Sequence, residues 1–297
     1  MRSKVMTLRD AAALIHDGDT VAVGGHTLRR HPMAMIHEII RQGRRHLKLQ
    51  GWNNGIDMDV LIGAGCVDSV ETSYIGISAF GLALHFRRAC ERDGLKVIEH
   101  SETTGIDMFR ATAMGMSFFP TKTPLGSDLM RANEHLAEVT CPFTGERYAA
   151  VKAARPDVAI IHAHTADAYG NVQLDPQRWH DNSTDVILAK SAGTVLVTVE
   201  QIVSDEEVLR NGLLTVLPRK FIAAVIEAPY GAHPTACDAR YDYDLEEVGK
   251  YYAASKSEGT FKQYLEERVL GVADHWGYLE AIGLERLMRL TRQRMVR

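Results

Sequence analysis

The residues that could do chemistry gather first in segment 21–32. There an apolar, β-branched run enters Gly24-Gly25, a basic loop with histidines carries Arg29 and Arg30, and a proline opens a helical pattern. We therefore expect a strand, a tight loop and a helix. Glycine lacks a Cβ, so the N–H groups of Gly24 and Gly25 can approach a ligand closely, and a helix start favours a carboxylate, phosphate or oxyanion. The two arginines strengthen the hypothesis of an anion site.

A plainer interpretation is that Gly24 and Gly25 only let a strand turn into a helix, as happens in many α/β proteins. The segment does not match the dinucleotide fingerprint, because the third glycine and the spacing of G-x-G-x-x-G are absent, and no GK[ST] follows as in a P-loop. Both interpretations of the turn stay open, whereas a nicotinamide-dependent dehydrogenase is disfavoured.

Glu102 is a second candidate, because it follows an apolar run at 95–99 and lies in the polar loop 100–105. Loops after strands carry many binding and catalytic residues, and a substrate can reach a carboxylate there. The alternative is a capping carboxylate at the start of the next helix. His162 and His164 would share one face of a strand, as a metal pair requires. Since no carboxylate or cysteine completes a set at a suggestive spacing, we predict no metal.

Around these residues, apolar runs typical of strands alternate with segments of helical period. The expected strands are 21–23, 47–52, 67–74, 95–99, 156–164, 194–199 and 221–226, and the expected helices are 8–15, 32–41, 61–65, 77–90, 106–116, 245–254, 261–269 and 278–288. This alternation predicts an α/β fold with an open, mostly parallel sheet and helices on both faces. No linker divides the chain, so we predict one domain, 1–297, with a C-terminal helical extension. Residues 118–128 are predicted to form a long irregular, functional loop.

Composition disfavours several classes of protein. Of the 297 residues 45% are hydrophobic, which suffices for a large core, and a formal net charge of −4 gives no basic footprint for nucleic acid. The four cysteines lack zinc or C-x-x-C spacing, and residues 1–4 do not resemble an export signal, so we expect reduced thiols in the cytoplasm. Apolar runs such as 221–226 are far shorter than the roughly 20 residues that span a bilayer, so no membrane segment is predicted.

Several distinct motifs are distributed along the chain from Met6 to about Leu284. They are Gly18-Asp19-Thr20 with Val23-Gly24-Gly25, Leu61-Ile62-Gly63-Ala64-Gly65, Asp157 to Ala163, Asp167-Ala168-Tyr169-Gly170-Asn171, Ile202 to Glu207, and Ala228 to Pro234 with Tyr241-Asp242-Tyr243-Asp244. In these motifs the chain resembles the A (alpha) subunit of family I coenzyme A transferases, with the glutaconate-transferring members nearest. The resemblance implies an open α/β sheet like that of ribose-phosphate isomerases, coenzyme A and acyl-CoA as substrates, and an obligate B (beta) subunit of similar fold.

The chemistry implied by this resemblance gives the glycine turn a role. In the family, the B subunit provides a glutamate that attacks an acyl-CoA thioester and later carries CoA as a glutamyl thioester, and each attack creates an oxyanion. The resemblance implies that this chain forms the facing wall, with Gly24 and Gly25 near the oxyanion or a substrate carboxylate. Arg29 or Arg30 would suit the distal carboxylate of a dicarboxylic acid. The resemblance also implies neighbouring loops that close the pocket, to which we expect Asn53, Gly126 and Ser127 to belong.

One departure from the family pattern concerns Glu102. The glutaconate enzyme has no glutamate in this loop, whereas a cousin in the family carries an acid there as its catalytic base. That cousin is the two-subunit hydrolase that opens the last steroid rings of cholesterol as CoA thioesters, and Gly126-Ser127-Asp128 resembles it too. The transferase hypothesis stays ahead, with Glu102 as a pocket residue. The alternatives are a C–C hydrolase with Glu102 as general base, and a non-catalytic partner or ligand-sensing module.

Overall fold

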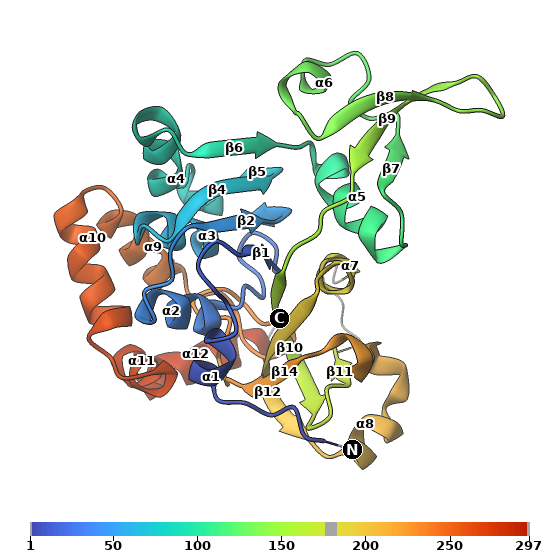
Figure 1. The fold of residues 1–297 in the computed structure, drawn as a ribbon. Coiled ribbons are helices and arrows are strands. Elements are labelled where there is room, and N and C mark those ends of the chain that lie inside the picture. The colour runs from blue at the N-terminus through green and yellow to red at the C-terminus, as the bar shows by residue number, and fades with distance from the viewer. Residues whose placement is uncertain (1, 176–182, 296–297) are drawn as a thin grey trace.

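A nine-stranded, mostly parallel sheet forms the centre of the fold (Figure 1). The computed structural model describes residues 2–175 and 183–295. Within these residues the parallel strands lie in the order β14-β12-β10-β1-β2-β4-β6. The short strand β11 pairs antiparallel with β10, and β13 pairs antiparallel with β11. The strands are β1 Thr20–Val23, β2 Leu47–Gln50, β4 Val67–Thr72, β6 Lys96–Glu99, β10 Val158–Asp167, β11 Val172–Gln173, β12 Thr194–Val203, β13 Thr215–Leu217 and β14 Ala224–Glu227. The predicted open, mostly parallel sheet is confirmed.

Helices cover both faces of this sheet, because its strands are apolar on both sides. In β1, Val21 and Val23 point into one hydrophobic cluster while Ala22 points into the other, as the alternation of side chains along a strand requires. Residues of α1, α2, α3, α9 and α10 complete the first cluster, and residues of α5 and α7 complete the second. These helices are α1 Leu8–Ala12, α2 Met33–Arg41, α3 Ile56–Gly63, α5 Glu102–Ala113, α7 Ser183–Ser191, α9 Leu245–Ala254 and α10 Glu258–Leu265. Each fully buried aliphatic side chain stabilises the fold by about 1.5–3 kcal/mol.

Residues 118–152 form a separate small lobe that the sequence did not predict. Three antiparallel strands, β7 Phe118–Thr121, β9 Arg147–Lys152 and β8 Leu136–Thr140, lie in the order β7-β9-β8, with α6 Leu129–Ala132 between β7 and β8. The expectation of an irregular loop at 118–128 is therefore wrong, because its first residues are a strand. Pro120 is compatible with that strand because β7 lies at the edge of the sheet. The lobe packs against α5 and projects from the main sheet (Figure 1).

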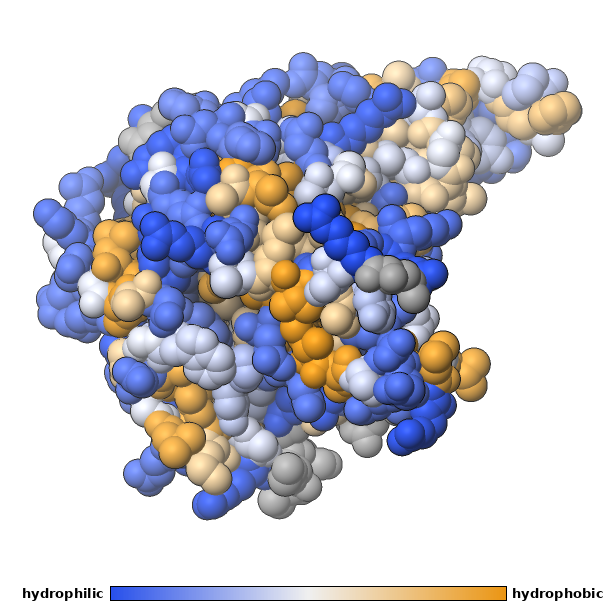
Figure 2. Space-filling view, turned by 60° about the horizontal axis from the view of Figure 1, so that its bottom comes forward, coloured by the Kyte–Doolittle hydropathy of each residue, from blue (hydrophilic) through white to orange (hydrophobic). Residues whose placement is uncertain are grey.

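The remaining helices, the surface and the cysteines complete the description of the fold. Ser204 caps α8 Asp205–Arg210. Of the C-terminal helices, α11 His275–Ile282 packs against α2, and α12 Leu284–Met295 packs against α11. Hydrophilic side chains cover most of the face shown in Figure 2, interrupted by small apolar groups. The four cysteines are free thiols. Among the described residues, no helix has the length and apolar character that a membrane crossing needs.

Candidate active site

Four strands of the main sheet end at one edge, and the residues that follow them meet there. Because β1, β2, β4 and β6 run parallel, their carboxyl ends lie side by side, which is the usual place for a site in an open α/β sheet. The polar residues that converge at this edge are His26 after β1, Asn53 after β2, Ser73 after β4 and Glu102 after β6. The structure thus brings two predicted residues, Asn53 and Glu102, together with two that sequence reasoning did not assign.

The side-chain amide of Asn53 connects this group. Its Nδ2 donates a hydrogen bond to Glu102 Oε1 at 3.0 Å and lies 3.2 Å from His26 Nε2, while its Oδ1 lies 3.4 Å from Ser73 Oγ. The contact with His26 is a hydrogen bond when Nε2 is the unprotonated ring nitrogen. Asn53 is only 5% exposed, whereas Glu102 is exposed. The buried Asn53 therefore holds the Glu102 carboxylate in place, and Glu102 remains accessible to a substrate from the solvent.

Glu102 is the first residue of α5, but it does not cap that helix. Ser101 is the N-cap: its hydroxyl accepts the N–H of Thr104, and the Thr104 hydroxyl accepts the N–H of Ser101. The carboxylate of Glu102 is thereby free to bond Asn53, and the indole N–H of Trp52 donates to the Glu102 carbonyl oxygen at 2.8 Å. The carboxylate stands at the start of a helix, where an anion is favoured, and this is a suitable place for a general base or a substrate-orienting group.

The glycine turn differs from what the sequence suggested. The N–H of Gly24 donates to the Ile160 carbonyl oxygen at 2.9 Å, and the N–H of Gly25 donates to Asp185 Oδ1 at 2.8 Å. Neither amide is free for an oxyanion, so that expectation is corrected. Glycine is required at position 25 for a packing reason, because its φ is +97° and a Cβ there would lie 2.4 Å from His31 Nδ1. The plainer interpretation of the turn agrees with the structure.

Both arginines of the turn are engaged in ion pairs within the chain. Arg30 is buried, with Nη1 2.6 Å from Asp185 Oδ2, and Arg29 is paired with the buried Asp238. Neither guanidinium is unpaired in the structure, and contact of Arg29 or Arg30 with a substrate carboxylate stays a prediction. The acids responsible are far away in the sequence, and no local pattern pointed to them.

A buried histidine lies directly beneath the turn. His31 is fully buried, and its Nδ1 lies 3.0 Å from the Gly24 carbonyl oxygen and 3.1 Å from Asp57 Oδ2. Burial by itself would lower the pKa of His31, but the charge and hydrogen bond of Asp57 outweigh it, so the pKa lies above its ordinary value. For Asp57 burial acts in the opposite direction, and His31 holds its pKa below the usual range. The pair anchors the turn from inside.

The other residues singled out in the sequence take no part in the hydrogen bonds of this cluster. Gly126 and Ser127 are exposed in the lobe, in the turn before α6, where the Ser127 hydroxyl donates to the Pro124 carbonyl oxygen at 2.7 Å. Their part in closing a pocket stays a prediction. His162 and His164 have separate partners, since His162 Nε2 lies 2.7 Å from Glu200 Oε1 and His164 bonds the Asp238 carbonyl oxygen.

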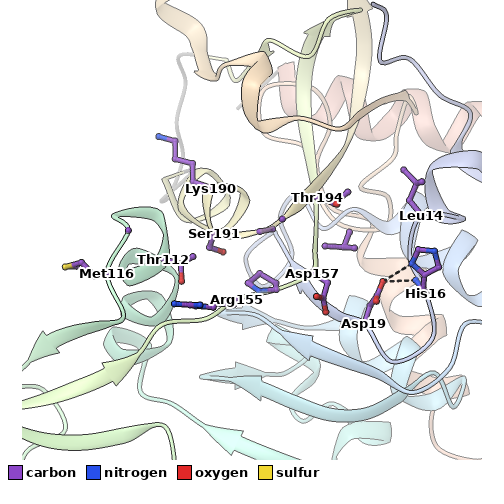
Figure 3. Close-up of a pocket in the computed structure, with 15 residues that line it drawn as sticks. Leu14, His16, Asp19, Thr112, Met116, Arg155, Asp157, Lys190, Ser191 and Thr194 are labelled. Atoms are coloured by element: carbon purple, nitrogen blue, oxygen red, sulfur yellow. Dashed lines mark hydrogen bonds and ion pairs between the residues drawn. The ribbon is translucent and has the colours of Figure 1, made fainter.

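A cavity of about 750 Å³ lies at the opposite end of the strands, where the parallel strands begin. In Figure 3, Asp19, Asp157 and Thr194 mark the amino ends of β1, β10 and β12, and Thr112 and Ser191 mark the ends of α5 and α7. His16 and Asp19 are paired there. This cavity is therefore distinct from the Asn53–Glu102 site, which lies where the strands end.

Comparison with known proteins identifies the class. Residues 5–228 match the coenzyme A transferase family, and the chain belongs to it. It is 36% identical to the A subunit of glutaconate CoA-transferase from Acidaminococcus fermentans, and the match covers 97% of this chain and 94% of that one. The crystal structure of that enzyme superposes with a TM-score of 0.92, covering 97% of this chain and 95% of the other.

Further relatives have different names. The A subunit of 3-oxoadipate CoA-transferase from Pseudomonas knackmussii is 36% identical, with 92% of this chain and 95% of that one covered. The cholesterol ring-cleaving hydrolase IpdA subunit of Rhodococcus jostii is 28% identical, with 93% of this chain and 95% of that one covered. An uncharacterized protein of Archaeoglobus fulgidus is 36% identical over 99% of this chain, which spans 66% of that protein.

Proposed function

We propose that this chain is the alpha subunit of a two-subunit CoA-transferase that moves CoA between an acyl-CoA and a short dicarboxylic or oxo acid, through a glutamyl-CoA thioester on a beta subunit. The main support is the 36% identity to the A subunit of glutaconate CoA-transferase over 97% of the chain. The second support is geometric. Glu102 is exposed at the carboxyl edge of the sheet, with Asn53 beneath it, so this chain alone forms only one wall of the site.

The proposed reaction proceeds in balanced acyl-transfer steps. A carboxylate from the beta subunit first attacks the thioester carbonyl, giving an acyl-glutamyl anhydride and CoA thiolate. The thiolate then attacks the glutamyl carbonyl, which forms the glutamyl thioester and releases the first acid as its carboxylate, and the acceptor acid reverses both steps. Asn53 holds Glu102, and Glu102 orients the substrate against the partner's nucleophile. The protein walls must also exclude water, because water would hydrolyse the thioester.

The test uses the complex of this chain with its beta subunit. We expect CoA exchange between two acids, and after incubation with acyl-CoA alone we expect borohydride or hydroxylamine to trap a modified glutamate on the beta subunit, detected by mass spectrometry. The isolated chain is the control and should exchange nothing. A complex that neither exchanges CoA nor carries a trapped adduct would contradict the proposal.

Glu102 supports a second candidate function, hydrolysis of a C–C bond in a CoA thioester with Glu102 as general base. The observation that favours it is an exposed carboxylate held by Asn53 in a chain that is 28% identical to a ring-cleaving hydrolase subunit. Glu102→Gln separates the two, because glutamine still accepts the Asn53 hydrogen bond but cannot take a proton. A hydrolase should lose about 10²- to 10⁴-fold in rate, whereas a transferase should keep the glutamyl adduct on its partner chain. A complex with neither reaction would indicate a non-catalytic module.

A further inference from the structure

A second, more deeply buried polar cluster involves residues close in sequence to Asn53 and Glu102. Its centre is the carboxylate of Glu71 on β4, whose Oε1 lies 3.0 Å from His100 Nε2 and 2.6 Å from His135 Nδ1. The other oxygen, Oε2, accepts the side-chain N–H of Gln50 at 2.7 Å. Glu71, His100 and Gln50 are buried, and His135 is only partly accessible. The Glu71 carboxylate thus bonds three side chains, each from a different segment of the chain.

These segments are the parts of the chain that define the candidate site. Gln50 is the last residue of β2, three positions before Asn53, and Glu71 is two positions before Ser73. His100 comes directly before the Ser101 cap of α5, and its Nδ1 lies 3.1 Å from the hydroxyl of Thr104 in the same capping box. Glu71 is therefore connected through His100 to the first turn of α5, where Glu102 stands.

His135 brings the lobe into the same cluster. It precedes β8, and the neighbouring Asn133 donates from Nδ2 to the Glu99 carbonyl oxygen at 2.7 Å at the end of β6. The lobe follows α5 directly in the chain and packs against it. A change in the position of the lobe relative to the main sheet would therefore reach the start of α5 by two routes. One is the packing of the lobe on α5, and the other is the series of hydrogen bonds from His135 through Glu71 to His100.

The electrostatics favour a permanent contact. Burial alone would raise the pKa of Glu71, but hydrogen bonds from His100, His135 and Gln50 lower it to about 2. Glu71 is therefore ionised throughout the working range of pH. Hydrogen bonds to an ionised acceptor are roughly twice as strong as neutral ones, and removing one partner of such a buried group is costly.

We propose that Glu71 is a positioning residue that links the lobe to the start of α5 and thereby fixes Glu102 against the substrate. The inference rests on the proposed function for its kinetic consequence only. Neither Glu71 nor His135 hydrogen-bonds Asn53 or Glu102 among the residues that the structure describes. They act through His100 and the capping box.

The test compares two replacements of His135 in the complete complex. His135→Ala removes the N–H that bonds Glu71, whereas the side-chain amide of His135→Asn places an N–H close to the original Nδ1 position. We expect the alanine variant to lose about 10- to 100-fold in kcat, as for a slightly misplaced catalytic group, with KM for acyl-CoA within about threefold of wild type. The asparagine variant should recover most of this loss. Glu71→Gln should behave like His135→Ala, and His46→Ala, on an exposed pair with Asp68, is the matched control.

A second readout does not depend on any reaction. Amide hydrogen exchange at the first turn of α5, residues 102–106, should quicken in His135→Ala and return in His135→Asn, while the melting temperatures of all variants are recorded to separate local from global loosening. If His135→Ala leaves this exchange unchanged, or if His135→Asn is as slow in catalysis as His135→Ala, the inference is wrong. If the wild-type complex catalyses none of the tested reactions, the proposed function fails, and the exchange result still decides the structural link.

Discussion

At the scale of residues, the turn after β1 is stabilised by charges that are buried and compensated. His31 and Asp57 form one buried pair, and Arg30 and Asp185 form a second. Asp185 also accepts the N–H of Gly25, so the turn and the second pair share one carboxylate. Removing one partner of such a buried pair typically costs about 3–5 kcal/mol, because the other charge is left uncompensated. The turn is therefore rigid, which suits a scaffold next to a site.

The first prediction concerns Gly25 itself. Gly25→Ala would place a Cβ 2.4 Å from His31 Nδ1 at a φ of +97°, so we expect the free energy of unfolding to fall by at least about 2 kcal/mol. Gly43→Ala, at a φ of +65° with no neighbour within 4 Å, is the matched control and should lose only about 1 kcal/mol. Urea unfolding measures both. A stable Gly25→Ala protein that only loses activity would instead restore the ligand-binding interpretation.

At the scale of elements, a buried carboxylate joins α3 to the C-terminal helices. Asp59 of α3 accepts the hydroxyl proton of Tyr251 of α9 at 2.6 Å and the N–H of Phe86 in α4 Leu84–Arg88 at 2.7 Å. Burial raises the pKa of Asp59 from 3.8 to about 6, although both hydrogen bonds oppose the rise. The folded protein therefore carries an unfavourable buried charge at neutral pH and gains from protonation at lower pH.

The second prediction follows from the sign of this shift. Because the pKa of Asp59 is higher in the folded state, its favourable contribution is complete below about pH 4 and is lost as the pH rises through 6. Asparagine keeps an acceptor for Phe86 and can donate to the Tyr251 oxygen, without the charge. We expect the free energy of unfolding of Asp59→Asn, relative to that of wild type, to rise by up to about 3 kcal/mol from pH 4 to pH 7.5. Urea unfolding at both pH values measures this difference. If the difference in free energy of unfolding between variant and wild type is the same at both pH values, the pKa of Asp59 is not raised in the folded protein.

At the scale of the whole molecule, the two edges of the sheet have different properties. The carboxyl edge carries Asn53 and Glu102, open to the outside, while the amino edge carries the 750 Å³ cavity of Figure 3. The lobe packs on α5, the helix that starts at the carboxyl edge. The A-subunit names of the relatives imply a second subunit, and under the proposed function it would complete the site at the exposed Glu102.

The third prediction concerns metal content. Two groups of side chains have donor atoms close enough for an ion among the residues described, Glu71 with His100 and His135, and His162 with Glu200 and Cys237. In both groups the carboxylate is already hydrogen-bonded within the protein. Glu71 bonds His100, His135 and Gln50, and Glu200 bonds His162, the Tyr230 N–H and the Tyr241 hydroxyl. We expect the complex to keep its activity after dialysis against a chelator, with elemental analysis below one metal per chain. Activity that disappears with the chelator and returns with zinc would contradict this.

The sequence by itself determined the seven parallel strands of the main sheet and the position of Glu102, whereas the helix α7 was not predicted. Helical period, alternation and capping residues act over a few neighbours. Thr7 and Ser204, which are N-caps in the structure, are examples of such local signals. Asn53 and Glu102 were also within reach, because each follows a strand whose carboxyl end was predictable. His26 and Ser73 follow strands in the same way and carry the signal that could have found them.

Only the tertiary structure decided what these residues touch. The partners of Gly25 and Arg29 are Asp185 and Asp238, 160 and 209 positions away, and no local pattern encodes such a distance. The lobe escaped prediction for the same reason, because β7 is held by β9, which lies beyond β8 in the chain. Hydrogen bonds and charges are satisfied wherever the folded chain brings partners together, so a residue type shows which chemistry is available, and packing decides whether that chemistry faces a ligand or the core.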